Sequence, residues 1–459
     1  MLSTTRLPER ERPYNLNLEL ARSRLGLLLQ KREDWGLFDY PGGETLTAEL
    51  AQTRRAFIEV LKVDATDPAA ASALADECLA DLIILGEKTA MFHAEIFLKR
   101  RRKTNGFAGG AFGCMADLSN FSDAHAGRLG EVSGFLSVPM SWKQTEPQEG
   151  QFQLGPVDGW VEWCHRRRLG VHGGPLISFE PGFLPEWVYI WEHDYETLRD
   201  MMYDHIQRLV KRYMKAVRVW NVISAVHAHN SFNLNFEQIM ELTRMSCALV
   251  KQLAPRSTVL IDLALPWGEY YADNPRTIPP MMYADMCVQS GVKFDAFGVR
   301  VLLGAAETGL YVRDLMQLSA KLDEFAGFGK PVHVTACQVP SATGGDPLDN
   351  WQGQMDPEHA GRWRGPWDQL TQSQWLEAFY ALALSKPFVQ SVCWRDLSDY
   401  EGHYMPHGGL CESNLRPKRA FASLKRVRAH LLGRKRGKAA AGNGSPNGAN
   451  NNGGPPAAS

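Results

Sequence analysis

The sequence lacks an excess of either charge, long apolar runs and closely spaced cysteines. Its 50 Lys and Arg residues nearly balance its 51 Asp and Glu residues, which argues against a dedicated nucleic-acid binder, because such proteins usually carry a basic excess. No apolar run reaches the roughly 18 residues of a membrane-spanning helix. The segment from Met1 to Arg24 has no continuous apolar stretch of the kind found in secretory signals. We therefore expect a cytoplasmic protein without membrane contact.

The eight cysteines are scattered, and none belongs to a C-x-x-C pair. Zinc sites use such pairs, and disulfide frameworks concentrate cysteines in short secreted chains. We therefore predict reduced, buried thiols. No cofactor or metal site is expected either, since His227 and His229 lie two residues apart but no carboxylate at ligand spacing accompanies them.

A globular protein is indicated by the 459 residues, of which 44% are hydrophobic and 22% charged. Residues 1–104 are predicted to be helical, because apolar residues recur at helical spacing in three stretches, the last running from Pro68 to about Lys103. That stretch ends in the basic tract 99–103, which we interpret as a solvated helix end. Residues 105–130 are rich in glycine at first and are predicted to form a linker that leads into the next region.

Short apolar runs alternate with helical patterns over residues 131–432. This alternation predicts parallel strands with crossover helices, and seven clear runs plus a weak one favour a (β/α)8 barrel. A doubly wound open sheet is disfavoured, because its Gly-rich phosphate-binding turn is missing. The seven runs are Gly134–Met140, Val171–Ser178, Val217–Ile223, Thr258–Leu263, Ala296–Leu302, Val332–Val339 and Val389–Trp394.

The last region, 433–459, is a low-complexity tail. From Ala439 onward it holds Gly, Asn, Ala, Pro and Ser without a large apolar residue, so we predict disorder. The basic stretch from Lys425 to Lys438 is interpreted as a charged helix face that runs into this tail, with contact to a polyanion as the alternative.

A series of motifs follows through the predicted barrel. They are Trp142-x-x-x-Glu146-Pro147-x-x-Gly150-x-Phe152, Val171–Leu176 with Leu184–Trp187, Val219–Ala225, Pro331–Gln338, and Trp394–Asp399 with Pro406–Leu410 and Arg416–Lys418. In this order they resemble glycoside hydrolase family 10, the endo-1,4-β-xylanase family, over roughly residues 130–430. The resemblance implies a (β/α)8 barrel, a role in carbohydrate metabolism, and a cleft for an oligo- or polysaccharide. The helical region 1–104 lies outside the resemblance.

The resemblance breaks at the residues that carry the chemistry. Retaining glycosidases use two carboxyl groups, one as proton donor and one as nucleophile. The position of the family's acid/base Glu holds Ala225, and the position of its nucleophile holds Ala336. A methyl group can neither donate a proton nor form a glycosyl ester. We therefore predict a catalytically degenerate, xylanase-like pseudoenzyme that at most binds carbohydrate.

Candidate cleft residues lie at the predicted C-terminal ends of the strands, where barrel enzymes carry their sites. They are Trp142, Glu180, Trp187, His227, Glu269, Arg300, Gln338, Trp394, Asp396 and Asp399. The tryptophans can stack on sugar rings or simply pack the barrel. The charged residues can be structural ion pairs.

Two other functions stay open. An active hydrolase of O-glycosyl bonds can use other groups, with Asp396 or Asp399 acting together with Glu269 or Glu180, and with His227 as a base. A scaffold protein can instead make contacts through its helical region and its basic stretch. Protein partners stay open in either case.

Overall fold

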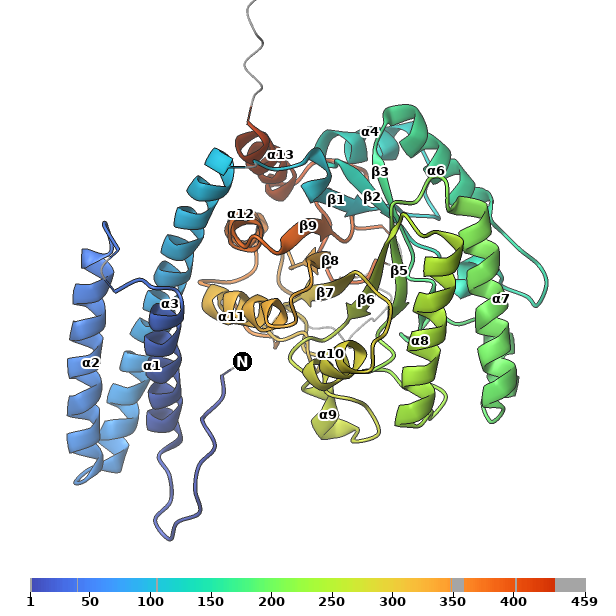
Figure 1. Cartoon of the computed structure of the whole chain (residues 1–459). Helices are drawn as coiled ribbons and strands as arrows, with labels where there is room; N and C mark the ends of the chain where they lie inside the picture. Colours follow the sequence, from blue (N-terminus) through green and yellow to red (C-terminus); the bar gives the residue numbers. More distant parts are fainter. Residues whose placement is uncertain are drawn as a thin grey trace, which may run out of the picture.

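Three long helices precede a closed barrel in the computed structural model, which describes residues 2–38, 40–104, 106–346, 348, 359–400 and 403–433 (Figure 1). The predicted disordered tail lies outside the described residues, apart from Gly433. All eight cysteines are free and buried, as predicted. Within the described ranges, no helix is both long enough and apolar enough to cross a membrane.

The N-terminal helices pack onto the outside of the barrel. They are α1 (Leu16–Asp34), α2 (Glu44–Asp64) and α3 (Pro68–Thr104). The long helix α3 contacts the barrel helices α11 (Leu315–Ala326) and α12 (Gln369–Ser385). Arg24 Nη2 lies 2.8 Å from Asp314 Oδ1 in a buried ion pair, and Glu87 Oε1 accepts a hydrogen bond of 2.6 Å from Trp363 Nε1. The helical region is therefore part of the folded body.

The basic tract at the end of α3 is only partly solvated, which differs from the prediction. Arg101 Nη1 donates to three carbonyl oxygens around the end of α12, those of Leu384, Lys386 and Val389, at 2.9–3.1 Å. Arg102 Nη2 donates to the carbonyl oxygen of His430 at 2.8 Å. These cations satisfy carbonyl groups that a helix end leaves without intrahelical partners.

The barrel is a parallel sheet that closes on itself, because the last strand pairs with the first. The short strands β3 and β4 both pair with β5, so they act as one broken strand and leave eight positions. The predicted (β/α)8 barrel is confirmed. Its strands are β1 (Phe112–Met115), β2 (Phe135–Val138), β3 (Gly170–Gly173), β4 (Ile177–Ser178), β5 (Val219–Ser224), β6 (Thr258–Leu263), β7 (Ala296–Leu302), β8 (Val332–Gln338) and β9 (Val389–Trp394).

The barrel begins before residue 131, because β1 lies inside the segment predicted to be a linker. The glycines of this segment reflect close packing. A Cβ atom on Gly113 would lie 2.1 Å from the ring of Phe135, and one on Gly134 would lie 1.7 Å from the carbonyl oxygen of Gly109. Glycine is therefore required at these two positions by the approach of neighbouring groups.

Helices surround the sheet on its outer side (Figure 1). Two of them begin with reciprocal capping boxes, Asn235 with Gln238 and Asp314 with Gln317, which satisfy free N–H groups of the first turn. Besides α11 and α12, the helices are α4 (Asp123–Val132), α6 (Gly155–Arg167), α7 (Tyr195–Tyr213), α8 (Phe236–Leu253), α10 (Pro280–Gln289) and α13 (Arg419–Leu432), with the short turns α5 (Trp142–Thr145), α9 (Tyr270–Asp273), η1 (Gly109–Ala111) and η2 (Glu186–Trp191).

Candidate functional site

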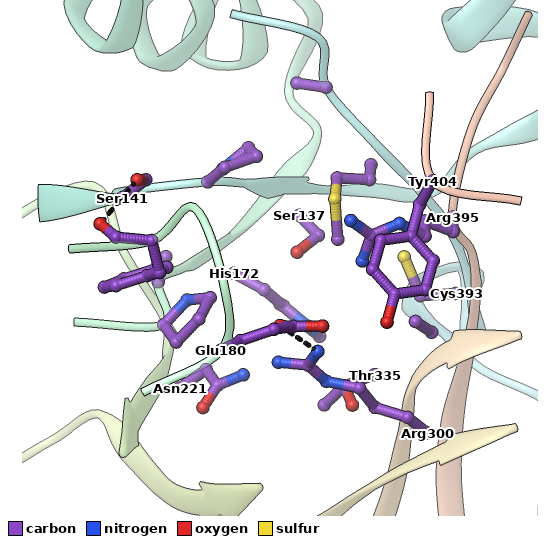
Figure 2. A pocket seen from close by; sticks show the side chains of 18 of the residues that line it. Ser137, Ser141, His172, Glu180, Asn221, Arg300, Thr335, Cys393, Arg395 and Tyr404 are labelled. Atoms are coloured by element: carbon purple, nitrogen blue, oxygen red, sulfur yellow. Dashed lines mark hydrogen bonds and ion pairs between the residues drawn. The ribbon is translucent and has the colours of Figure 1, made fainter. Parts of the chain in front are cut away.

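A cavity of about 600 Å³ reaches from the C-terminal ends of the strands into the barrel (Figure 2). Barrel interiors are usually filled by bulky branched side chains. Several inward positions here instead carry small or polar residues, so the interior is not filled. These include Ser137, Asn221, Thr335, Ala336, Ser391 and Cys393.

Arg300 on β7 is the centre of a buried polar network at the mouth. Its Nη1 donates to Glu180 Oε2 at 2.6 Å, and its Nε donates to Asp262 Oδ2 at 2.8 Å. Its Nη2 donates to Ser224 Oγ at 2.5 Å. Only 7% of the Arg300 side chain is exposed, and Asp262 is fully buried. A buried charge is tolerated when it is both paired and hydrogen-bonded. Arg300, Glu180 and Asp262 each meet that requirement.

The ion pair determines the protonation of Glu180. Burial by itself raises the pKa of this carboxyl, but Arg300 and Arg395 outweigh that effect and lower it to about 2. Burial likewise opposes ionisation of Arg300, while Glu180 and Asp262 raise the pKa of the guanidinium. Glu180 is therefore ionised at physiological pH and has no proton to donate to a leaving group.

A second cation lies beside this network. The guanidinium carbon of Arg395 lies 4.2 Å from the centre of the Tyr404 ring, which is the geometry of a cation–π contact. Figure 2 shows both side chains next to Arg300 and Glu180. The loop that carries Tyr404 is anchored by an ion pair of 2.9 Å between His403 and Asp346. Burial lowers the pKa of His403, but hydrogen bonds to Asp346 and to the Tyr400 carbonyl raise it to about 9.

Ala225 and Ala336 each adjoin a residue of the Arg300 network. Ala336 lines the cavity and is opposite Arg300 in the register of β7 and β8. Ala225 directly follows Ser224, which bonds to Arg300, and it is fully buried. Its φ of 58° is in the left-handed region, which costs roughly 1–2 kcal/mol for a residue with a Cβ atom. Strained backbone of this kind is enriched at functional sites.

Of the predicted cleft residues, the structure places Glu180 and Arg300 together on the cavity wall. Trp142 is 1% exposed and stacks on His205, and its Nε1 donates to Glu146 Oε2 at 2.9 Å. Trp187 packs edge-on against Trp142. Trp142 is buried and Trp187 is partly exposed, and neither is among the residues that line the cavity.

The other predicted residues also lie outside the cavity wall. His227 is fully buried, stacks on Tyr283 and has a pKa lowered to about 4 by burial. Trp394 and Gln338 are fully buried, and Trp394 Nε1 donates to the Gly408 carbonyl. The acidic residues are paired with cations: Glu269 with Arg313, Asp399 with Lys418 and, at 3.8 Å, Asp396 with Arg395.

Sequence reasoning missed Asp262, Tyr404 and Glu307. Asp262 is the one charged residue in the apolar run Thr258–Leu263, and this signal could have identified it. Glu307 follows β7, and burial, reinforced by Glu180, raises the pKa of its carboxyl. No sequence pattern identifies Tyr404, because only the fold of the loop after β9 brings it to the site.

Comparison with known proteins relates this barrel to one family. The model of glycosyl hydrolase family 10 matches residues 136–425. Endo-1,4-beta-xylanase B of Humicola insolens is 30% identical over 83 residues, which is 18% of this chain and 23% of that protein. Endo-1,4-beta-xylanase A of Fusarium oxysporum f. sp. lycopersici is 24% identical over 174 residues, or 37% of this chain and 51% of that protein. The chain thus spans about a quarter to a half of the length of these relatives.

Solved structures share the fold at low identity. The family 10 structure from Paenibacillus barcinonensis superposes with a TM-score of 0.53 at 16% identity, over 71% of this chain and 96% of that one. Xylanase 10B from Thermotoga petrophila RKU-1 in complex with xylobiose gives 0.52 at 16% identity, over 73% and 98%. At these identities the likeness establishes the architecture of the barrel.

Proposed function

Because the chain belongs to glycosyl hydrolase family 10, we propose that its barrel is a degenerate glycosidase that binds a saccharide without cleaving it by the retaining mechanism. The observation that carries this proposal is the Arg300 network, which adjoins Ala336 in the register of β7 and β8 and includes Ser224, the residue before Ala225. The motifs around these alanines align them with the family's two glutamates. At the same place the protein holds a guanidinium whose donors bond to Glu180, Asp262 and Ser224.

The retaining mechanism needs two carboxyl groups about 5–5.5 Å apart, one protonated and one ionised. Among the described residues, the carboxyl groups that line the cavity are Glu180 and Asp117. Glu180 is bound to Arg300, and Asp117 Oδ1 accepts hydrogen bonds from the backbone and hydroxyl of Ser119. Neither carboxyl lies at the end of the strands that carry the family's glutamates.

Saccharide binding is supported by the character of the cavity. Its volume falls within the range of about 300–1,000 Å³ of small-molecule sites. The cavity is lined by hydrogen-bond donors and acceptors for sugar hydroxyl groups and by aromatic rings. The polar and aromatic residues include Ser137, Gln144, Asn221, Thr335, Arg395, Tyr400 and Tyr404.

Assays with xylan and calorimetry with xylo-oligosaccharides test this proposal. We expect measurable binding and no release of reducing sugar above that of a buffer control. The double variant Ala225→Glu/Ala336→Glu should stay inactive, because Arg300 can pair with each new carboxylate. The triple variant that adds Arg300→Gln tests whether pairing with Arg300 is what keeps the double variant inactive. Hydrolysis by the unmodified protein through a trapped glycosyl-enzyme intermediate would contradict the proposal.

An active hydrolase that uses other carboxyl groups is a second candidate function. One observation favours it: the pKa of Glu307 is raised while that of the neighbouring Glu180 is lowered, and such opposed pairs are typical of acid and base assignments. In that case Glu307→Gln should abolish any hydrolysis of an aryl glycoside. Glu162→Gln, whose side chain on α6 is 70% exposed and does not line the cavity, is the matched control and should leave it unchanged.

A further inference from the structure

We propose that the cavity admits the end of a saccharide chain or a short oligosaccharide, and excludes an internal segment of a polysaccharide. This inference rests on the proposed saccharide binding and adds which part of a saccharide enters. Its basis is a partition across the barrel mouth, formed by the side chains of Glu180, Arg300 and Tyr404.

The partition separates two cavities of very different size. Glu180, Arg300 and Tyr404 line the large cavity of about 600 Å³, and the same three residues line a second cavity of about 10 Å³. A volume of about 10 Å³ accommodates one water molecule. The rest of the small cavity's wall comes from the end of β7 and from the loops after β5, β6 and β7, through His229, Ala264, Leu265, Pro266, Leu302, Gly309 and Leu310. Only one side of the partition therefore has room for a sugar ring.

An apolar cluster fills the far side. Leu302, Leu310 and Met405 are each at most 4% exposed and pack together with Ala305 and Ala336, separately from the main core. Leu265 and Tyr404 pack against this cluster. Ala336 belongs to this cluster and also lines the large cavity, so one of the two alanines lies where the cluster borders the cavity. A polysaccharide crossing the mouth would have to displace this cluster.

The polar part of the partition is held in place from several directions. Asp262 and Ser224 anchor Arg300 from below, and Arg300 in turn holds Glu180. The backbone N–H of Glu180 also donates to Ser178 Oγ at 3.2 Å. Removing one member of a buried, hydrogen-bonded ion pair leaves the other charge uncompensated. Opening the partition for a polymer is therefore unfavourable.

On the large-cavity side, Arg395 lines the wall beside Tyr404, and its side chain is 19% exposed. Its buried Nε has no hydrogen-bond partner among the described residues, and the nearest carboxylate oxygen, on Asp396, is 3.8 Å away. A terminal sugar that abuts the partition can offer a hydroxyl oxygen to the guanidinium. This arrangement suits a ligand that ends at the partition.

A length series of oligosaccharides tests the inference. Calorimetry with xylo-, cello- and manno-oligosaccharides of two to six units identifies the sugar that binds and gives Kd against length. We expect Kd to level off, with less than about a threefold gain beyond three units. Binding to the parent polysaccharide should scale with the concentration of chain ends, so that partial digestion at constant mass increases it.

The outcomes separate this inference from the proposed function. Kd that improves steadily to six units, with polymer binding that does not depend on the number of chain ends, overturns the inference and leaves saccharide binding intact. Absence of binding across the panel overturns both. In the variant Tyr404→Ala, Kd should continue to improve beyond three units. Tyr271→Ala, on an exposed tyrosine of α9, is the matched control. The length series on the unmodified protein decides the matter even if Tyr404→Ala does not fold.

Discussion

The two halves of the barrel mouth are built from different kinds of side chain. On the side of the loops after β1, β2, β4 and β9, a cavity of about 600 Å³ reaches into the barrel, where small and polar side chains of β2, β5, β8 and β9 line it. On the side of the loops after β5, β6 and β7, leucines pack with Met405 from the loop after β9 into an apolar cluster, and a cavity of about 10 Å³ remains. The same barrel supports both halves, which shows that the residues at the strand ends and in the loops after them determine whether the mouth is open.

The largest effect is expected for Arg300→Leu, which removes the cation that both halves share. Glu180 and Asp262 would lose the cation that compensates their charge, and breaking a buried ion pair in this way costs about 3–5 kcal/mol. The free energy of unfolding in urea measures this loss. Arg166→Leu, which removes an exposed pair with Glu162, should change stability by less than about 0.5 kcal/mol. Equal effects of the two variants would show that the network does not stabilise the mouth.

Met405→Ala tests the apolar half. Met405 is fully buried in the cluster, and buried Met→Ala substitutions cost about 2–5 kcal/mol. The matched variant Met282→Ala affects a side chain of α10 that is half-exposed, and we expect a much smaller loss. Thermal unfolding compares the two. If both variants unfold at the temperature of the unmodified protein, the far half of the mouth is not a packed cluster.

Acid should weaken the partition. The folded pKa of Glu180 is lowered from 4.5 to about 2, so its ionisation contributes stability that is fully present above pH 4.5 and is lost as the pH falls toward 2. The full shift corresponds to about 3 kcal/mol. Glu180→Gln removes this dependence, so the stability difference between unmodified protein and variant should shrink between pH 4.5 and 2. A difference that stays constant over this range would show that Glu180 titrates normally.

Much of the architecture was predictable, because it depends on local patterns. The strands from β2 to β9 lie within the apolar runs or extend beyond them by one residue, and helices α1–α3 occur where apolar residues recur at helical spacing. Strand β1 was not predicted. It has four residues, and the glycines around it are typical of a linker in sequence but serve close packing in the structure.

The candidate site was predictable only in part. Glu180 and Arg300 were expected at strand ends and line the cavity together, whereas Trp142, His227 and Trp394 are buried in packed surroundings. A sequence places a residue near the end of a strand but does not determine whether its side chain points into the cavity or into the core. That depends on the bends of the loops and on which neighbours take up the space.

The sequence by itself determined the parallel barrel, the helical region before it, and the identity of the alanines at 225 and 336. These properties follow from periodicity and from residue identity, which act locally along the chain. Only the tertiary structure decided that Arg300 bonds to Glu180, Asp262 and Ser224, that Glu180 is held ionised beside it, and that one half of the mouth is closed. These properties arise from contacts between residues far apart in the sequence, such as Glu180 and Arg300, or Leu302 and Met405, and they exist only when the barrel is closed.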